Sequence, residues 1–310
     1  MIEVQSLSRF YGAHRAVSDV SFSIQANEVV GFLGLNGAGK STTLKVIAGL
    51  LLPSSGTVVV DNVDMATAPV SFRSQIGFLP EDPPLHTEMT VTEFLTYLGG
   101  IRGMSGRDIA ARLPVVIAAC QLKGQEDRLI AELSHGFRKR VGIAQAIIHR
   151  PKLVILDEPI SGLDPYQIVE MREVIRGLSS EATVLVSSHI LSEISQTCDR
   201  LLVLHKGKLV ATGSEEELAK RVSTSPLLEM TLISDLERLK SVLDAHDSVD
   251  DYKVVAQQDP YVKVEVQLNA EAHDDLIIAM VGAGIGVRRM VDAHGELEAT
   301  FLNLTRGESA

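Results

Sequence analysis

The sequence predicts an α/β fold that is followed by a smaller α+β domain. Short β-type runs alternate with helical patterns over the first 220 residues. Two of these runs, 153–156 and 183–187, are apolar almost throughout, which is typical of parallel strands buried on both faces. A short polar segment at 222–226 follows, and the segments after it alternate in the order βαββαβ. We therefore expect domains at 1–221 and 227–310, joined by a linker at 222–226.

In the first domain, β-type runs bounded by turns predict strands, and apolar residues three and four apart predict helices. The expected strands lie at 2–7, 17–24, 28–33, 57–60, 153–156, 183–187, 201–205 and 208–211. The expected helices lie at 40–48, 91–98, 108–122, 138–148, 166–178 and 215–221. The concentration of helical patterns after residue 90 indicates a helical subdomain at about 82–150, beside antiparallel β structure and a parallel core.

In the second domain, the same reasoning predicts a ferredoxin-like α+β fold. The expected strands lie at 227–233, 251–257, 261–269 and 285–293. The expected helices lie at 235–246, 271–281 and 295–305.

The composition excludes several classes of protein. The net charge is −11, and residues 222–310 hold 16 acidic against seven basic side chains, which leaves −2 for residues 1–221. This acidic balance argues against nucleic acid or bare anionic lipid as the main ligand. The only cysteines, Cys120 and Cys198, exclude a disulfide scaffold and favour a reducing cytosol. No apolar stretch reaches 18 residues and no secretory signal is present, so we expect a chain that does not itself cross a membrane.

The strongest motif is GLNGAGKS at 34–41, which matches the G-x-x-x-x-G-K-[ST] pattern. It directly follows a predicted strand and opens a predicted helix. Glycines let such a turn direct its N–H groups at an anion, and the start of a helix adds a partial positive charge. Lys40 would supply a positive charge for the β and γ phosphates of a nucleotide, and Ser41 a hydroxyl for Mg²⁺. The motif therefore predicts a P-loop nucleotide site.

Two acidic residues follow the buried strand 153–156. Asp157 is placed to join the Mg²⁺ shell, and Glu158 to polarise an attacking water. A third motif, LSHGF at 133–137, precedes a helical pattern, and Ser134 and Gly136 there predict a second anion-binding helix start. On the residues alone this start is either an ordinary N-cap or, since the P-loop already binds the phosphates, a contact to the γ phosphate held by another subunit. We expect the basic run at 138–140 to be the solvated beginning of that helix.

The order GLNGAGKST, LSHGFRKR, LVILDEP, SGLD and SSH resembles the nucleotide-binding domain of the ATP-binding cassette family. The match covers about residues 1–220. The sequences LPED at 79–82 and DEPISGLDP are similar to those of the bacterial exporter-type branch, and LEATFLNLT at 297–305 resembles the end of such chains.

The resemblance implies a role for individual residues. ATP would be bound by an aromatic side chain and the P-loop, namely Tyr11, Asn36, Gly37, Ala38, Gly39, Lys40, Ser41 and Thr42. Glu158 would be the general base, and His189 would contact the γ phosphate and hold the attacking water. Across a dimer seam, ATP would be contacted by Ser134 and Gly136, with Asp164 linking the two sites. Mg²⁺ would be bound by Ser41, Asp157 and Glu81.

Two positions depart from the family pattern. Glu81 stands where the family usually has glutamine, in the loop that joins the core to the helical subdomain. A carboxylate there can ligate Mg²⁺, but it adds negative charge beside the phosphates. Phe137 stands where glutamine is common, so an amide contact to the nucleotide across the seam is lost.

The resemblance implies an ATPase that drives transport and uses ATP and Mg²⁺. Two such chains, expected to be identical, would enclose two ATP molecules head to tail and drive a separately encoded permease. The chain would lie at the cytoplasmic face of the plasma membrane. The alternative is a soluble cassette ATPase that acts on DNA or ribosomes. The acidic balance disfavours it, and so does the separation of only 93 residues between Lys40 and Ser134, which leaves no room for a long coiled-coil insert.

Two interpretations remain for the domain at 227–310. It is either a dimerisation element or a regulatory module that senses a small ligand or the partner. A chain truncated at Val222 that dimerises and hydrolyses ATP normally would exclude the first.

Overall fold

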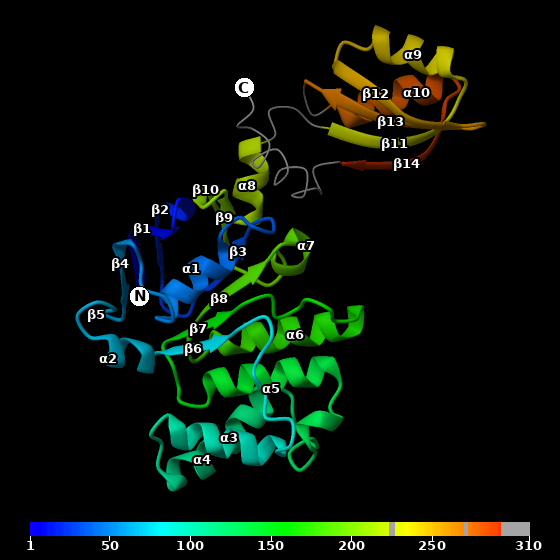
Figure 1. Cartoon of the computed structure of the whole chain (residues 1–310). Helices are drawn as coiled ribbons and strands as arrows, with labels where there is room; N and C mark the ends of the chain where they lie inside the picture. The colour runs from blue at the N-terminus through cyan, green and yellow to red at the C-terminus, as the bar shows by residue number, and fades with distance from the viewer. Residues whose placement is uncertain (223–226, 270–271, 293–310) are drawn as a thin grey trace. The chain divides into compact units, whose positions relative to one another are not determined.

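The computed structural model describes residues 1–222, 227–269 and 272–292. The chain divides into two compact units, Met1–Glu215 and Glu216–Ala310 (Figure 1). Most of the linker predicted at 222–226, and the helix predicted at 295–305, lie outside the described residues. Among the helices that the model describes, none has the length and apolar character needed to span a bilayer.

The first unit contains two sheets. The smaller one is antiparallel, with the order β2-β1-β4-β5. Its strands are β1 (Ile2–Tyr11), β2 (His14–Ile24), β4 (Ser55–Val60) and β5 (Val63–Asp64). The larger sheet has the order β10-β9-β3-β8-β7-β6 and is parallel except for the edge strand β10. Its strands are β3 (Val29–Leu33), β6 (Ile76–Leu79), β7 (Leu153–Leu156), β8 (Thr183–Ser188), β9 (Arg200–His205) and β10 (Lys208–Gly213).

The apolar runs at 153–156 and 183–187 form β7 and β8 in the middle of the larger sheet. Every residue of both strands is buried, which confirms the expectation of buried parallel strands. Because β3 lies next to β8, the carboxyl ends of these three strands meet at one edge of the sheet. The motifs that follow the strands in the sequence are therefore brought together in space.

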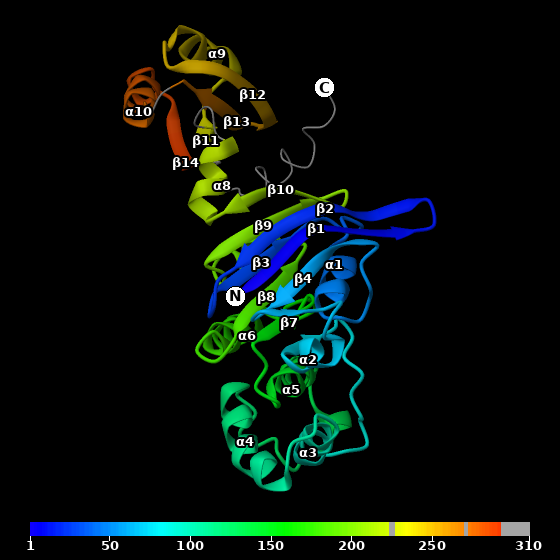
Figure 2. The same ribbon diagram turned by 90° about the vertical axis from the view of Figure 1, so that its left-hand side faces the viewer.

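Helices cover the sheets and form a separate group. The helices of the first unit are α1 (Lys40–Ile47), α2 (Pro69–Ser74), α3 (Val91–Ile101), α4 (Gly106–Ala119), α5 (His135–Ile147), α6 (Pro165–Leu178), α7 (Leu191–Ile194) and the short 3₁₀ helix Ile130–Glu132. The apolar residues of α1 pack into the core between the two sheets. At the opposite end of the unit from β1 and β2, α3 and α4 gather against α5 (Figures 1 and 2).

Helix α5 packs tightly on β6 because each element contributes a glycine to the contact. A Cβ atom on Gly77 would lie 2.0 Å from the carbonyl oxygen of Ala146, and one on Gly142 would lie 2.5 Å from Leu79. Neither position can accept a side chain without displacing its neighbour. This contact fixes the second half of α5 against β6, at one edge of the parallel sheet.

Replacing Gly77 by alanine is expected to lower the melting temperature by several degrees. The added methyl group meets backbone rather than a flexible side chain, and overpacking of this kind costs about 1–3 kcal/mol. The matched control is Gly100→Ala in α3, where an added Cβ meets nothing within 4 Å. Thermal unfolding would measure the melting temperatures of both variants against that of the wild type. An unchanged melting temperature for Gly77→Ala would contradict the packing argument.

Several short elements were not predicted. β5 and α2 have only two and six residues, so their patterns repeat too few times to be recognised, and the apolar run of β6 is interrupted by Gly77, which weakens its strand signal. The segment at 76–79, to which the sequence analysis assigned no element, is the edge strand β6, which pairs with β7. The helix expected at 108–122 begins earlier, at Gly106, because the Ser105 hydroxyl caps its N-terminus by accepting a hydrogen bond from the Asp108 amide. It ends at Ala119, before Gln121, whose φ of +51° is not helical.

The second unit has the ferredoxin-like arrangement that the sequence predicts. Its strands are β11 (Leu227–Ile233), β12 (Val249–Gln258), β13 (Tyr261–Leu268) and β14 (Gly286–Asp292), and its helices are α9 (Leu236–Ala245) and α10 (His273–Gly282), preceded by α8 (Glu215–Val222). The strands pair antiparallel in the order β12-β13-β11-β14. Alternate residues of β11 and β13 form one core with α9 and α10, so both helices cover the same face of the sheet.

Candidate active site

A glycine-rich loop joins β3 to α1. Gly37 and Gly39 adopt positive φ angles of +82° and +100°, a region that other residues rarely occupy. A Cβ on Gly39, which caps α1, would also lie only 2.4 Å from the carbonyl oxygen of Ala16. The loop thus requires glycine on two counts, and it leads directly into the N-terminus of α1, where the unpaired N–H groups favour an anion.

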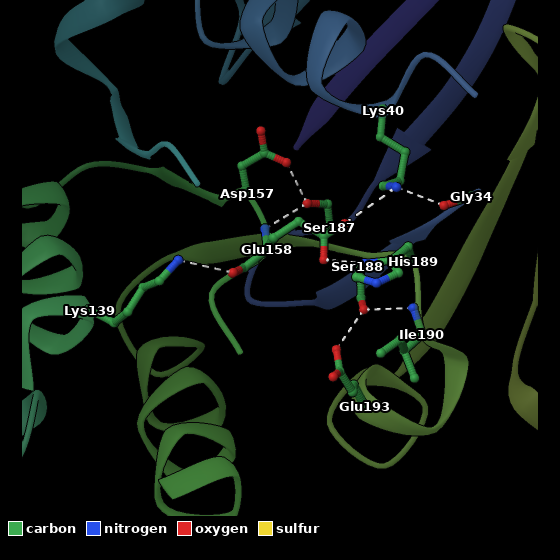
Figure 3. Close-up of polar contacts among 10 residues, drawn as sticks. All are labelled: Gly34, Lys40, Lys139, Asp157, Glu158, Ser187, Ser188, His189, Ile190 and Glu193. Atoms are coloured by element: carbon green, nitrogen blue, oxygen red, sulfur yellow. Dashed lines mark hydrogen bonds and ion pairs between the residues drawn. The ribbon is translucent and has the colours of Figure 1, made fainter. Parts of the chain in front are cut away.

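Lys40, the first residue of α1, is buried and points toward the carboxylate of Glu158 (Figure 3). Its Nζ donates a hydrogen bond of 2.7 Å to the carbonyl oxygen of Gly34 and lies 3.3 Å from Oε1 of Glu158. The other carboxylate oxygen of Glu158 lies 2.9 Å from Nδ1 of His189. The carboxylate of Glu158 is therefore held between two cationic or potentially cationic groups.

The turn that follows β8 is fixed by a serine hydroxyl. Oγ of Ser188 donates to the carboxylate of Glu193 at 2.8 Å and accepts from the amide of Ile190 at 2.9 Å. These bonds bracket His189 (Figure 3), whose side chain is 37% exposed and lines the cavity described below. An imidazole so placed can exchange a hydrogen bond with a ligand in the cavity.

Asp157 and Glu158 follow β7 and are both buried, at 2% and 6% exposure. The Ser187 hydroxyl lies between them, donating to Oδ1 of Asp157 at 2.7 Å and accepting from the amide of Glu158 at 2.9 Å. Glu158 has a φ of +50°, in the left-handed region that favours glycine. Such conformations persist only where the surrounding structure holds them, and they concentrate at functional sites.

Lys139 approaches the same peptide from α5. Its Nζ donates to the carbonyl oxygen of Glu81 at 2.6 Å and to that of Glu158 at 3.4 Å. Burial lowers the pKa of Lys139, and the nearby carboxylates, among them those of Asp82 and Glu81, oppose this effect. The ammonium group thus connects three segments: α5, the loop after β6 and the end of β7.

A cavity of about 350 Å³ opens over the loop and the charged cluster. Most residues that the sequence predicted for ATP, metal or catalysis line it: Tyr11, Asn36, Gly37, Gly39, Lys40, Ser41, Thr42, Glu81, Glu158 and His189. Of the residues predicted to bind ATP or Mg²⁺ within one chain, two do not line the cavity. Ala38 is buried beneath the loop, and Asp157 lies behind the lining, where it binds Ser187.

The remaining predicted residues line a second cavity of about 320 Å³ in the same unit. Ser134 and Asp164 are the N-caps of α5 and α6, and their side chains accept hydrogen bonds from backbone amides of Phe137 and Gln167. Gly136 lies beside the side chain of Gln167. The structure thus brings Ser134, Gly136 and Asp164 together, but it does not bring them to the first cavity.

The structure corrects one prediction and adds residues that were missed. The basic run at 138–140 is not a solvated helix start, because Lys139 and Arg140 are only 3% and 5% exposed, and Arg140 pairs with Glu170. The helical spacing could have revealed this, since Lys139 shares a face with Ile143. His14 and Ala16, at the start of β2, line the first cavity and were not predicted.

Known proteins with similar sequences support the interpretation of this site. Residues 17–161 match the family model described as ABC transporter. A bacitracin transport ATP-binding protein, BcrA of Bacillus licheniformis, is 32% identical over 309 residues, which cover 99% of this chain and 98% of that protein. A Nod factor export ATP-binding protein I of Rhizobium meliloti (strain 1021) is 33% identical over 310 residues, with 99% and 88% covered. The chain belongs to the ABC transporter family.

A solved structure described as the ATP-binding subunit of an ABC transporter shares the fold of this chain. It is 34% identical and has a TM-score of 0.64, covering 71% of this chain and 92% of that one. The family resemblance and the P-loop ATPase core predicted from sequence are therefore confirmed. The chain is an ATPase subunit of an ABC transporter and binds ATP, and the alternative of a soluble cassette acting on DNA or ribosomes is not favoured.

Proposed function

We propose that this chain is the motor subunit of an exporter, a homodimer that drives a separately encoded transmembrane permease from the cytoplasmic face of the plasma membrane. The names of its relatives support export, since one belongs to bacitracin transport and another to Nod factor export. The observation that carries the proposal is the division of the predicted site residues between two cavities of one unit.

That division suits a nucleotide shared by two chains. The first cavity offers a phosphate-binding loop, a lysine and a carboxylate, whereas the second offers two helix N-termini capped by Ser134 and Asp164. In a head-to-tail dimer, the second cavity of one chain would cover the first cavity of the other. Each chain alone would then enclose only half of a triphosphate.

In the first cavity, the chain's residues would bind ATP by its phosphates. The N-terminus of α1 and Lys40 would contact the β and γ phosphates, and Asn36 and Thr42 would lie alongside them. Tyr11, half exposed at the end of β1, would stack on the adenine. The phosphate oxygens would compete with Glu158 for Lys40, so ATP binding would release one oxygen of that carboxylate.

The oxygen donors near the loop fit Mg²⁺, which prefers octahedral oxygen ligands and keeps several waters and phosphate oxygens. Ser41 and Glu81 line the cavity, and Asp157 presents a carboxylate behind it, oriented by Ser187. We propose that these three residues hold the ion, whose charge would neutralise the phosphates during transfer.

We propose that Glu158 acts as the general base. A base must lie within hydrogen-bond reach of the proton that it takes, and Glu158 lines the same cavity as Lys40 and the loop. His189 contacts its carboxylate through Nδ1, so it can orient the base and present its other ring nitrogen to the γ phosphate or the attacking water. Hydrolysis would remove the γ phosphate that joins the two chains, and the dimer would open.

Recovery of the membrane partner tests the proposed function. Tagged full-length chain carrying Glu158→Gln, incubated with ATP, should retain an integral membrane protein from detergent-solubilised membranes. The same chain carrying Lys40→Met, which we expect to bind ATP poorly, should retain less of it. Absence of any polytopic membrane protein in both samples would contradict a permease-driving role.

The concentration dependence of hydrolysis tests the shared site. The ATPase rate per chain should rise with protein concentration and then reach a plateau, because only the dimer encloses the nucleotide. A rate per chain that stays constant down to low nanomolar concentrations would exclude the shared site.

Replacing Glu81 by glutamine is expected to leave ATP binding within about threefold and to change transport coupling. The Glu81 side chain lines the cavity, but its backbone carbonyl makes the contact to Lys139, and the substitution preserves that contact. Nucleotide titration and transport by the reconstituted complex would check both expectations. Wild-type transport by the variant would count against a coupling role for this carboxylate.

A further inference from the structure

The hydroxyl of Ser187 connects the two acidic residues of the site. Ser187 is fully buried in β8, and its Oγ lies 2.7 Å from Oδ1 of Asp157 and 2.9 Å from the amide nitrogen of Glu158 (Figure 3). A serine hydroxyl has one proton to donate. Since the amide of Glu158 is itself a donor, that proton goes to Asp157, and the oxygen accepts from Glu158. The serine hydroxyl thus uses both its donated and its accepted hydrogen bond on the two acidic residues of the site.

The opposite side of the Glu158 backbone is bound by Lys139. The Nζ of this buried lysine is shared between the carbonyl oxygens of Glu81 and Glu158. The amide of Glu158 is therefore held from β8 and its carbonyl from α5. These contacts flank the one residue of the site, apart from glycines, that has a left-handed backbone.

We propose that Ser187 and Lys139 are positioning residues that hold Glu158 in its left-handed conformation from two sides and so aim its carboxylate into the cavity. This inference rests on the role of general base proposed for Glu158. If either contact is lost, the backbone of Glu158 can relax toward an ordinary conformation, and the direction of its side chain changes with φ and ψ. Nucleotide binding depends on the loop and Lys40, so it should be spared.

The contact of Lys139 also gives the site a connection to the second cavity. Lys139 is the fifth residue of α5, and Ser134 at the N-cap of the same helix lines that second cavity. A displacement of α5 would therefore move the Lys139 side chain and change its hydrogen bond to the carbonyl oxygen of Glu158. Contact of the helix N-terminus with a second chain can bias the base in the first cavity by this route.

Steady-state hydrolysis and nucleotide binding by full-length variants test the proposal. Ser187→Ala and Lys139→Met should each lower kcat at least tenfold, while the Kd for a fluorescent ADP analogue stays within twofold. Ser187→Thr and Lys139→Arg, which keep the hydroxyl and the cation, should recover much of the loss. Thr183→Val removes a buried hydroxyl at the other end of β8, where it contacts the backbone of residues 25 and 27, and should leave kcat within twofold.

The same substitutions made in a chain that lacks the proposed base distinguish an effect on the position of Glu158 from an effect on Asp157 or on the fold. In chains that already carry Glu158→Gln, Ser187→Ala and Lys139→Met should reduce the residual rate less than twofold, because residues that act through one group are not additive. A loss of the same size in both backgrounds would place the effect on Asp157 or on the fold and would overturn the proposal. So would a wild-type kcat for both single variants.

If Glu158 is not the general base, the experiment gives a result that differs from a failure of the positioning proposal. If Glu158→Gln alone keeps the wild-type rate, the role of Glu158 is wrong, whatever Ser187 and Lys139 do. If Ser187→Ala does not fold, the Lys139→Met and Lys139→Arg pair in both backgrounds decides the proposal by itself.

Discussion

Replacing Glu158 by glutamine is expected to reduce ATP turnover at least about 100-fold while ATP still binds. A positioned general base contributes roughly 10²–10⁴ to the rate, and glutamine has the shape of glutamate without its basicity. The amide oxygen can still accept from Lys40, which lies 3.3 Å from Oε1, so the loop should keep its geometry. Phosphate release at saturating ATP and titration with a fluorescent nucleotide would measure the two effects separately.

The control for this variant is Glu173→Gln, which removes an exposed carboxylate from α6 in the same unit. It should hydrolyse ATP at the wild-type rate. Turnover within fivefold of wild type in Glu158→Gln would show that another group takes the proton from the attacking water.

Replacing Lys40 by methionine is expected to weaken nucleotide binding roughly 10- to 150-fold, since a hydrogen bond to a charged group contributes about 1.5–3 kcal/mol. Methionine keeps much of the apolar stem but cannot contact a phosphate. The variant also removes the cation that faces the buried carboxylate of Glu158, which leaves the hydrogen bond with His189 as the side-chain contact of that carboxylate. A modest loss of stability should therefore accompany the loss of binding.

Lys45→Met is the matched control, because Lys45 is an exposed lysine in the last turn of the same helix. Both variants lose one positive charge and gain the same side chain, so a difference in Kd between them reports on position alone. Equal nucleotide affinity of the two variants would exclude Lys40 as a phosphate ligand.

Much of the fold is visible in the sequence because its signals are local. Buried strands such as β7 and β8 are short apolar runs, and the βαββαβ order of the second unit repeats a simple alternation. Of the segments that were missed, β5 and α2 have too few residues to repeat a pattern, and β6 has a glycine within its apolar run. β6 has four residues and is recognisable only through its pairing with β7, which is a property of the sheet and not of the segment.

The same distinction applies to the site. The glycine loop and Lys40 could be predicted because they are adjacent in the chain, and Asp157 and Glu158 because they end an apolar strand. Ser187 lies 29 residues from Glu158 in the chain, and only the pairing of β7 with β8 brings its hydroxyl to that peptide. Lys139 was misjudged because a run of basic residues usually lies in solvent. Here the close approach of α5 to β6 buries it.

The ion pair between Lys40 and Glu158 limits which anions can bind to the phosphate loop. The lysine already has an anionic partner at 3.3 Å inside the protein, so an incoming anion must displace that partner. A polyphosphate with several charged oxygens can do so, whereas a small monovalent ion offers too little in exchange. The Lys40–Glu158 pair therefore favours nucleoside polyphosphates over smaller anions as ligands of the loop.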